Sequence, residues 1–336
     1  MQPVELSINH LPSPTWRWLK VNDCKVSFPA APAAEATADY SAFDGIATGA
    51  GQEFNQYMTK ANTFVETFEG KTEEPLRLPM YFAAENTLNR YGFRVQEDAE
   101  RVVIMDFTSA EDAGSAGVQT KAILEKNAVL TLVQIHRCGD DFTLINDVGI
   151  QVQEGATAKI IHVVLAGKHT MIGTEVSLQG DKSVTDIHTA YLVEKDHRLD
   201  MNYNIPVYGK QTRSDLSAKG VLRDTAWKTM RDTLDFKRGC AGSSGDEMED
   251  VMLLSDGIVN QSVPLILCEE EDVEGNHGAS IGQLREDLLF YLESRGISEA
   301  NIYELLAQAR LDAVIKMIPD EQTVAQFIET EEDCPC

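Results

Sequence analysis

His277 is the residue best suited to hold a ligand, and two glycines, Gly275 and Gly278, lie close to it in the chain. A neutral imidazole is a borderline ligand that suits iron, and it titrates near neutral pH. The glycines allow a second backbone or a bound group to approach closely. A histidine beside glycines is also common in purely structural roles, so the residue types alone leave both interpretations open.

The six cysteines offer thiolates, which are the usual ligands of iron–sulfur clusters. Cys268 precedes His277 and could approach it if the chain turns back. Because Cys268 ends an apolar run, and free cysteine is often buried, we expect it in the core. Cys334 and Cys336 could share a metal, but no third ligand is near in sequence, so we expect a flexible tail. The other three are isolated and are expected to pack: Cys24, Cys138 and Cys240.

The acidic run at residues 269–272 offers hard oxygen ligands that could attract iron. Charge runs of this kind are usually solvated turns, and we expect a turn here. Familiar catalytic templates are absent from the sequence: there is no Gly-x-x-x-x-Gly-Lys-Ser/Thr loop, no Gly-x-Ser-x-Gly elbow, no His-Glu-x-x-His and no Cys-x-x-Cys pair. We therefore expect that the chain is not itself an enzyme.

The formal net charge is −25, from 54 acidic and 29 basic residues. Such a surface repels phosphate backbones and anionic membranes, so we expect neither nucleic acid nor membrane as a partner. The charge serves either solubility or a complementary basic partner. No apolar run approaches the roughly 20 residues that span a bilayer, and the first residues lack the pattern of a secretory signal. We therefore expect reduced thiols and a cytoplasmic protein.

Residues 85–282 must position these groups, and their side chains alternate between apolar and polar. Short β-rich runs, such as 158–165, 171–178 and 184–193, have centres about 13 to 15 residues apart, with Gly and Asp between them. This spacing, without intervening helical patterns, predicts an all-β array. A sandwich or barrel would fit, as would a β-solenoid in which each unit stacks on its neighbours.

The flanking regions have different patterns. Residues 1–84 are expected to be irregular, with a helix over 53–69 where apolar residues recur at helical spacing. Residues 283–336 are expected to form a helical domain. One helix ends before Gly296, a second begins at Ser298 and a third begins near Pro319, as capping preferences indicate. The expected division is therefore 1–84, 85–282 and 283–336.

Ordered motifs across about residues 85–330 carry a specific resemblance. They comprise Asp-Phe-Lys-Arg-Gly-Cys-Ala-Gly-Ser at 235–243, Leu-Leu-Ser-Asp at 253–256, Pro264, Asp272-Val273, His277-Gly278-Ala279-Ser280, Gly282 and Leu-Phe-Tyr-Leu-Glu-Ser-Arg-Gly-Ile at 289–297. Their order and types resemble the SufB/SufD family of the SUF iron–sulfur cluster assembly system.

Two features resemble SufD more than SufB. Gly278 stands where SufB proteins have a carboxylate after the histidine, and Asn260-Gln261-Ser262 replaces their cysteine motif. Many SufD proteins have a cysteine two residues before the histidine, whereas this chain has Gly275.

The resemblance implies a mainly β fold, a right-handed parallel β-helix with a C-terminal helical domain and a short irregular or helical N-terminal region. It implies a scaffold subunit that pairs with a SufB-like subunit through the β-helix and docks a SufC-like ATPase through the C-terminal helices. Iron or an iron–sulfur cluster would be held transiently in the complex, with no stably bound cofactor. An isolated chain is expected to form a homodimer.

The resemblance also assigns the candidate residues. His277 would face the SufB-like partner as a cluster or iron ligand, with Cys268 a weaker candidate. The partner-binding candidates on the helical side are Phe290, Tyr291, Arg295 and Gly296. Two other functions stay open on the residues: a β-helical carbohydrate-active enzyme, which needs paired carboxylates in a groove, and a homodimeric β-solenoid interaction module without a metal role.

Overall fold

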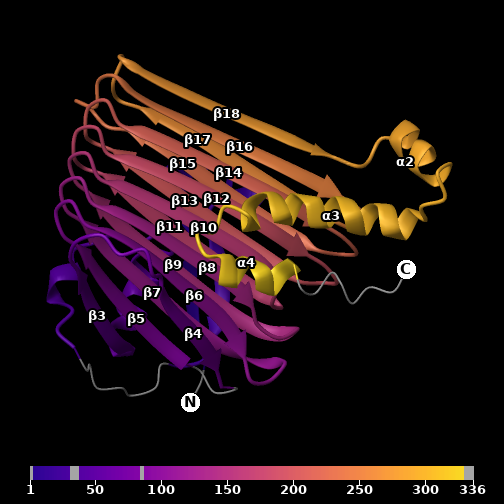
Figure 1. Ribbon diagram of the computed structural model, residues 1–336, viewed down its shortest axis with the longest axis horizontal. Coiled ribbons are helices and arrows are strands. Elements are labelled where there is room, and N and C mark those ends of the chain that lie inside the picture. Colours follow the sequence, from indigo (N-terminus) through magenta and orange to yellow (C-terminus); the bar gives the residue numbers. More distant parts are fainter. Residues whose placement is uncertain (1–2, 31–37, 84–86, 329–336) are drawn as a thin grey trace.

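Two parallel eight-stranded sheets form the body of the protein (Figure 1). The computed structural model describes residues 3–30, 38–83 and 87–328. Cys334 and Cys336 lie outside these residues. The odd sheet contains β3 (Asn62–Phe68), β5 (Thr87–Val95), β7 (Ala113–Leu124), β9 (Asp141–Val152), β11 (His169–Leu178), β13 (Arg198–Val207), β15 (Trp227–Phe236) and β17 (Val259–Cys268). The even sheet contains β4 (Leu76–Phe82), β6 (Glu100–Ser109), β8 (Val129–Arg137), β10 (Thr157–Ala166), β12 (Val184–Val193), β14 (Arg213–Leu222), β16 (Ser243–Leu253) and β18 (Val273–Gly282).

The chain alternates between the two sheets, so one coil consists of an odd strand followed by an even strand. Like residues stack in register from coil to coil, as do Leu132, Ile160 and Ile187 on β8, β10 and β12. Because one coil contains two strands, the spacing from one predicted strand to the next in the sequence corresponds to half of a coil. This arrangement confirms the β-helix, or β-solenoid, and excludes the sandwich and the barrel.

A core of apolar side chains fills the space between the sheets from Phe68 to Val251. Period-two alternation sends every second residue of each strand into this core, as Leu130 and Leu132 on β8 show, while Val133 faces outward. Each coil buries its apolar face only when a neighbouring coil stacks on it, which makes the array one cooperative body.

A left-handed residue recurs in the turn that precedes successive even strands. These residues are Asp98, Asn127, Gly155, Lys182, Gln211 and Gly242, all with φ between 55° and 75°. The backbone N–H of each donates to a carbonyl of the following coil, from Asp98 N to Lys126 O at 3.0 Å through to Gly242 N to Asp272 O at 2.7 Å. The column is thus a ladder of turn hydrogen bonds along one edge of the solenoid.

The helix predicted over residues 53–69 is only partly present. Helix α1 (Gln52–Tyr57) and a 3-10 turn (Met58–Lys60) occupy its first half, but the second half is strand β3. Phe68 reaches the core between the sheets, and pairing of β3 with β5 overrides the weak helical spacing. Strands β3 and β4 both precede residue 85 and form the first coil.

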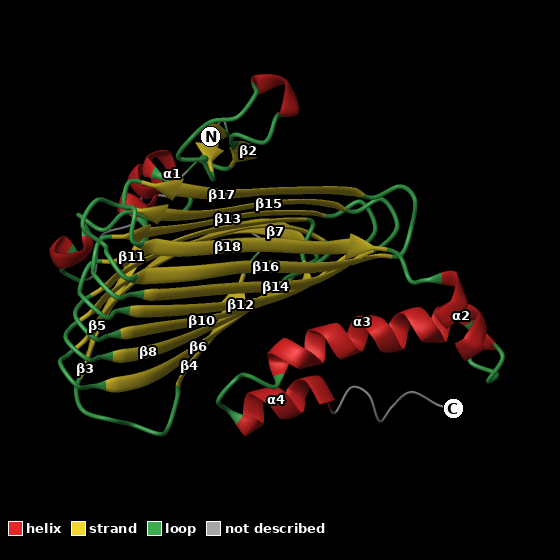
Figure 2. Ribbon diagram, turned by 90° about the horizontal axis from the view of Figure 1, so that it is seen from above, coloured by secondary structure: helices red, strands yellow, loops and turns green. Residues whose placement is uncertain are grey.

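Two of the C-terminal helices, α3 (Glu299–Ile315) and α4 (Glu321–Ile328), cover the outer face of the even sheet, while α2 (Glu286–Glu293) lies beyond the ends of its strands (Figure 2). Helix α3 packs Leu311, Val314 and Ile315 against outward apolar residues of the sheet, such as Val133 and Ile161. Along the chain, α2 precedes α3 and α4 follows it. The predicted helical region after residue 282 is therefore confirmed.

The N-terminal arm, residues 3–30, lies on the outer face of the odd sheet. Its strands β1 (Val4–Ile8) and β2 (Cys24–Phe28) pair antiparallel and bury Ile8 and Phe28 against Ile145 and Met171 of the sheet. Among the described residues, no helix is long and apolar enough to cross a membrane.

Candidate partner and ligand site at the open end of the solenoid

Strands β17 and β18 form the last coil, and each is the terminal strand of its sheet. No further coil covers them, so most side chains of β17 are half-buried and most of β18 are exposed. Each strand has ten residues, and its outer edge presents backbone groups that pair with no other described strand. We call this last coil the open end.

His277 lies in the middle of β18, where its Cα pairs in register with Glu247 of β16. Register partners in stacked strands point to the same side of a sheet, so His277 faces the interior side, as buried Glu247 does. The absence of a further coil leaves His277 exposed. Its imidazole has no hydrogen-bond partner among the described residues, which leaves both ring nitrogens available to an incoming group.

The glycines around His277 have close neighbours. A Cβ at Gly275 would lie 3.1 Å from Phe236 Cε2 and 3.2 Å from Ile266 Cγ2. A Cβ at Gly278 would lie 3.0 Å from Met248 Sδ. A cysteine at position 275 would therefore need a small shift of the core residues beneath it, and the glycine lets the last coil pack closely.

A buried ion pair lies directly beneath the open end. Lys228 of β15 pairs with Glu249 of β16, and the hydroxyl of Ser262 on β17 also donates to Glu249. The hydroxyl of Tyr191 donates to the same carboxylate at 3.1 Å. Burial lowers the pKa of Lys228, while the Glu249 charge opposes that shift. Three donors thus satisfy one buried carboxylate, which fixes the floor of the open end.

Two more carboxyl groups, Asp232 and Glu247, lie buried in the same layer. Burial raises the pKa of Asp232 to about 7, and the charge of Glu249 adds to the shift. Burial and the charge of Asp232 raise the pKa of Glu247 to about 9. Neither carboxylate oxygen of Glu247 has a hydrogen-bond partner among the described residues. Glu247 therefore holds a proton at neutral pH.

A second polar chain runs deeper inside the solenoid. Gln134 Oε1 contacts Nε2 of His162 at 3.0 Å, and the other ring nitrogen of His162 contacts the hydroxyl of Tyr203 at 3.1 Å. Asn146 donates to Gln134 Oε1 at 2.7 Å. Burial lowers the pKa of His162 to about 3, so its imidazole is neutral and can accept or donate in this chain.

The structure corrects the expectation for Cys268. It is exposed at the end of β17, where the core cannot enclose it because no coil follows, and its thiol contacts Glu270 O at 2.9 Å. Cys138 and Cys240 are buried, as expected, and Cys24 is partly buried. Within the described ranges, no three His, Cys, Asp or Glu side chains are arranged to hold a metal ion. His277 and Cys268 therefore form no complete metal site with other described residues.

The helical candidates form an exposed surface on α2. Phe290 is 73% exposed and Tyr291 is 51% exposed, and none of the α2 side chains is buried. The guanidinium of Arg295 lies over the Tyr291 ring, 5.1 Å from its centroid. Gly296 ends the helix with a φ of 86°, which favours glycine, and its N–H donates to Glu293 O at 2.8 Å. Leu305 on α3 is 61% exposed and adds to the apolar surface.

The buried layer beneath His277 was not predicted from the sequence. Its signal is the segment Asp-Glu-Met-Glu-Asp at 246–250, in which the alternation puts Glu247 and Glu249 on the inward face of a strand. Charged residues at inward positions of a strand are costly unless partnered, and they mark a specialised layer. The acidic run at 269–272 lies in the turn between β17 and β18, as expected.

The amino-acid sequence of this chain was compared with known protein families and with individual proteins. Residues 82–310 match the family described as "SUF system FeS cluster assembly, SufBD core domain". The chain is 24% identical over 163 residues to the iron–sulfur cluster assembly protein SufD of Bacillus subtilis (strain 168), covering 48% of this chain and 37% of that protein.

Other relatives give similar values. An iron–sulfur cluster assembly SufBD family protein of Mycobacterium leprae (strain TN) is 24% identical over 243 residues, covering 70% of this chain and 61% of the relative. A SufBD family protein of Pyrococcus horikoshii is 26% identical over 173 residues, covering 51% of this chain and 38% of the relative. The chain thus spans between about a third and three fifths of the length of these relatives. Because the SufBD core match covers more than half of the chain, from the end of the first coil into α3, the protein belongs to the SufB/SufD family of iron–sulfur cluster assembly proteins.

Proposed function

We propose that this protein is a SufD-like scaffold subunit of a SUF iron–sulfur cluster assembly complex. In this role it pairs with a SufB-like subunit through the open end and docks a SufC-like ATPase through α2 and the start of α3. The observation that carries the proposal is the open end itself. Two terminal strands of ten residues each leave a β edge and a half-filled interior without a cover.

The open end suits another β-helix. An uncovered edge strand pairs readily with a second strand, and a protein that stays soluble normally blocks such an edge. Ile281 on β18 is 45% exposed on the inward side, above Val251 of β16. A partner coil would bury Ile281 and continue both sheets. An isolated chain would use the same edge for a homodimer, although two chains with a net charge of −25 repel each other.

His277 would then lie at the junction of the two subunits. Iron or a nascent cluster is the cargo of the complex in this proposal, not a resident cofactor. In this proposal the partner subunit supplies the remaining ligands, since the described residues of this chain hold no group of three metal ligands. The free imidazole of His277 is the group that this chain contributes.

Helix α2 is the surface proposed for the ATPase. It exposes Phe290 and Tyr291, whereas α3 and α4 use their apolar residues to cover the even sheet. Large exposed aromatic residues on a helix are frequent centres of protein interfaces. Membership of the SufB/SufD family supports this assembly role over the carbohydrate-active enzyme.

Co-expression with the SufB-like and SufC-like proteins of the same genome tests the proposal. Deleting residues 283–336 would strip α3 from the even sheet, so point variants are the better probe. Ile281→Lys should abolish recovery of the SufB-like subunit, while Met248→Lys, at an exposed outward position on β16, should not. Phe290→Ala with Tyr291→Ala should abolish recovery of the SufC-like ATPase, while Tyr81→Ala, also at an exposed aromatic position, should not. Absence of any complex with the unmodified chain would overturn the assignment.

A further inference from the structure

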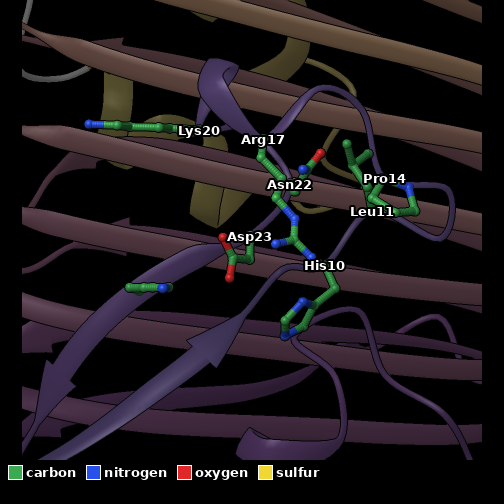
Figure 3. Close-up of a pocket in the computed structure, with 8 residues that line it drawn as sticks. His10, Leu11, Pro14, Arg17, Lys20, Asn22 and Asp23 are labelled. Carbon is green, nitrogen blue, oxygen red and sulfur yellow. The ribbon is translucent and has the colours of Figure 1, made fainter.

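The tip of the N-terminal arm is a closed loop, residues 15–22, that we call the tryptophan loop (Figure 3). The Asn22 side chain closes it. Its Oδ1 accepts from the Thr15 N–H at 2.7 Å and from the Thr15 hydroxyl at 2.9 Å, and its Nδ2 donates to Thr15 O at 3.1 Å. Trp16 and Trp18 are each 74% exposed on this loop. A fixed loop therefore presents two indoles to solvent.

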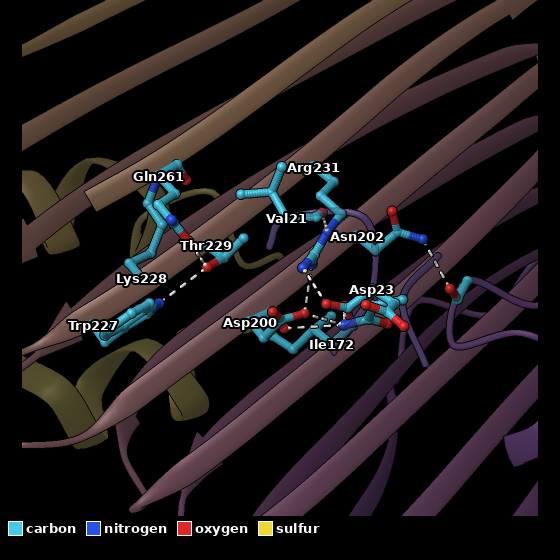
Figure 4. Close-up of polar contacts among 12 residues, drawn as sticks. Val21, Asp23, Ile172, Asp200, Asn202, Trp227, Lys228, Thr229, Arg231 and Gln261 are labelled. Atoms are coloured by element: carbon cyan, nitrogen blue, oxygen red, sulfur yellow. Dashed lines mark hydrogen bonds and ion pairs between the residues drawn. The ribbon is translucent and has the colours of Figure 1, made fainter. Parts of the chain in front are cut away.

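The base of the loop is held firmly. Val21 is buried, and its carbonyl accepts a hydrogen bond from Arg231 of β15. A second bond runs from Arg231 Nη2 to Asp23 O at 3.2 Å (Figure 4). In addition, Leu11 N donates to Asn22 O at 2.9 Å. Since the loop is closed and its base is fastened to the sheet, the exposure of the tryptophans is a property of the fold. Exposed tryptophans on a preorganised loop are suited to bury apolar surface of a partner at low entropic cost.

The loop and the arm strand beside it carry unpaired positive charge. Arg17, Lys20 and Lys25 are exposed, and none of them forms an ion pair with another described residue. All three line a cavity of about 770 Å³ together with His10 (Figure 3). The one carboxylate in its lining, Asp23, accepts a hydrogen bond from the Ser7 hydroxyl at 2.8 Å. The cavity is therefore positive on a protein whose net charge is strongly negative.

A smaller cavity of about 200 Å³ continues this surface along the odd sheet. It shares Lys20, Asp23 and Lys25 with the first cavity. It also reaches Arg198, Trp227 and Asp200, and the Asp200 carboxylate pairs with Arg231. The guanidinium of Arg198 lies over the Trp227 ring, 5.1 Å from its centroid. Cationic and aromatic groups thus alternate along one connected surface, between the arm and the ends of β13 and β15.

The surrounding charge restricts what can bind there. A net charge of −25 repels an extended polyanion such as nucleic acid or an anionic membrane before it reaches the island of positive charge. It also opposes a second copy of this chain. A short acidic segment can reach the island because its few charges meet Arg17, Lys20 and Lys25 directly. The two indoles require that the segment also carries an apolar side chain.

We propose that the tryptophan loop and the cavity beside it bind a short acidic segment of a partner protein, a segment that also carries apolar side chains. This surface is on the outer face of the odd sheet, away from the helices on the even sheet (Figure 2), and its smaller cavity reaches Gln261 of β17. The interaction is independent of the assembly role proposed above, and the isolated full chain is sufficient to test it.

The test uses a short synthetic peptide of alternating Glu and Leu, and the same peptide with Gln in place of Glu. Binding is measured by calorimetry and by the tryptophan fluorescence of the full chain. The Glu peptide should bind, should shift the emission of the exposed tryptophans, and should weaken as salt rises. Arg17→Glu with Lys20→Glu should weaken binding at least about tenfold, since reversing two charges replaces two ion pairs by repulsion.

Matched variants complete the design. Lys182→Glu with Lys210→Glu makes the same change of net charge at two exposed turn positions and should leave affinity unchanged. Trp16→Ala with Trp18→Ala should abolish binding while thermal unfolding stays the same, because both side chains are exposed. Equal affinity for the Glu and Gln peptides would overturn the proposal. Tighter binding to phosphatidylserine vesicles or to a single-stranded oligonucleotide, or concentration-dependent self-association lost in the tryptophan variant, would also overturn it.

Discussion

Arg231 and Asp200, on neighbouring strands of the odd sheet, form a buried ion pair that fastens the N-terminal arm to the solenoid (Figure 4). Arg231 Nη1 lies 2.7 Å from Asp200 Oδ1, and the same carboxylate oxygen accepts from Asn9 Nδ2 at 2.7 Å. The remaining guanidinium nitrogens donate to Val21 O and Asp23 O. One pair of side chains therefore joins two strands of the sheet to both ends of the arm's loop region.

Arg231→Ala should destabilise the protein by about 3–5 kcal/mol, because it leaves the Asp200 carboxylate buried with less compensation and frees two carbonyls of the arm. Urea unfolding measures the change, and limited proteolysis near residues 12–22 should become faster. Asp23→Ala is the control, because Arg231 bonds only to the backbone carbonyl of Asp23 and the variant keeps that bond. Equal stability of Arg231→Ala and the unmodified chain would show that Arg231 does not help to hold the arm on the sheet.

Glu247 should make stability depend on pH. Its pKa is raised to about 9 and that of Asp232 to about 7, so these two groups bind more protons in the folded state than in the unfolded chain above about pH 4. Their contribution to stability therefore falls as pH rises from about 5 to 9. The charged groups around the pair in this layer are Lys228 and Glu249.

Glu247→Gln removes this proton-binding group. The stability difference between the unmodified chain and the variant should shift against the unmodified chain by up to about 1.4 kcal/mol per pH unit within that window. Urea unfolding at a series of pH values measures the slope. Glu274→Gln, at an exposed position on β18, should leave the slope unchanged. If the slope of unfolding free energy against pH were the same in Glu247→Gln and Glu274→Gln, the proton would be bound by a group other than Glu247.

The column of left-handed turn residues predicts that substitutions at two of its positions differ in their effect on stability. Gly155 has a φ of 66°, and a Cβ there would lie 2.5 Å from Asn127 Oδ1. Gly155→Ala should cost about 1–2 kcal/mol. Lys182 already bears that strain at a φ of 59°, so Lys182→Gly should change stability by less than about 0.5 kcal/mol. Lys159→Gly, in the interior of β10, should cost about 1 kcal/mol and serves as the comparison for urea midpoints.

The same column explains which parts of the fold could be predicted from the sequence. The positions of the strands could be predicted from the alternation of apolar and polar residues, because most inward residues of each coil are apolar. The stacking of the coils could not be predicted in this way, because the turn that repeats in each coil is defined by a backbone conformation. Asp98, Asn127, Lys182 and Gln211 adopt it as well as the glycines, so no residue motif marks it. The prediction that the coils stack into a β-helix came from the resemblance to the SufB/SufD family.

The sequence predicted the exposed residues of the candidate site but not the buried polar residues beneath them. His277, Gly296 and the Ser298 cap follow local rules, and the Ser298 hydroxyl accepts from Asn301 N at 3.3 Å. The exposure of Cys268 depends on the absence of a further coil, which an apolar run of residues does not reveal. The partners of Lys228 lie on other strands, and register cannot be computed from one strand alone.

His277→Ala should leave the complex assembled but lower its cluster yield, because the exposed ring contributes no described contact to the fold and only a ligand to the junction. The co-purified complex is reconstituted with iron and sulfide, and the cluster is quantified by visible absorbance and by iron content. His277→Cys keeps a ligand of the kind that clusters prefer and should recover more of the yield than His277→Gln. Thermal unfolding of all three variants should match that of the unmodified complex. An unchanged cluster yield in His277→Ala would show that His277 does not act as a ligand. A yield lowered equally by His277→Cys would show that the ring acts through its shape and not as a ligand.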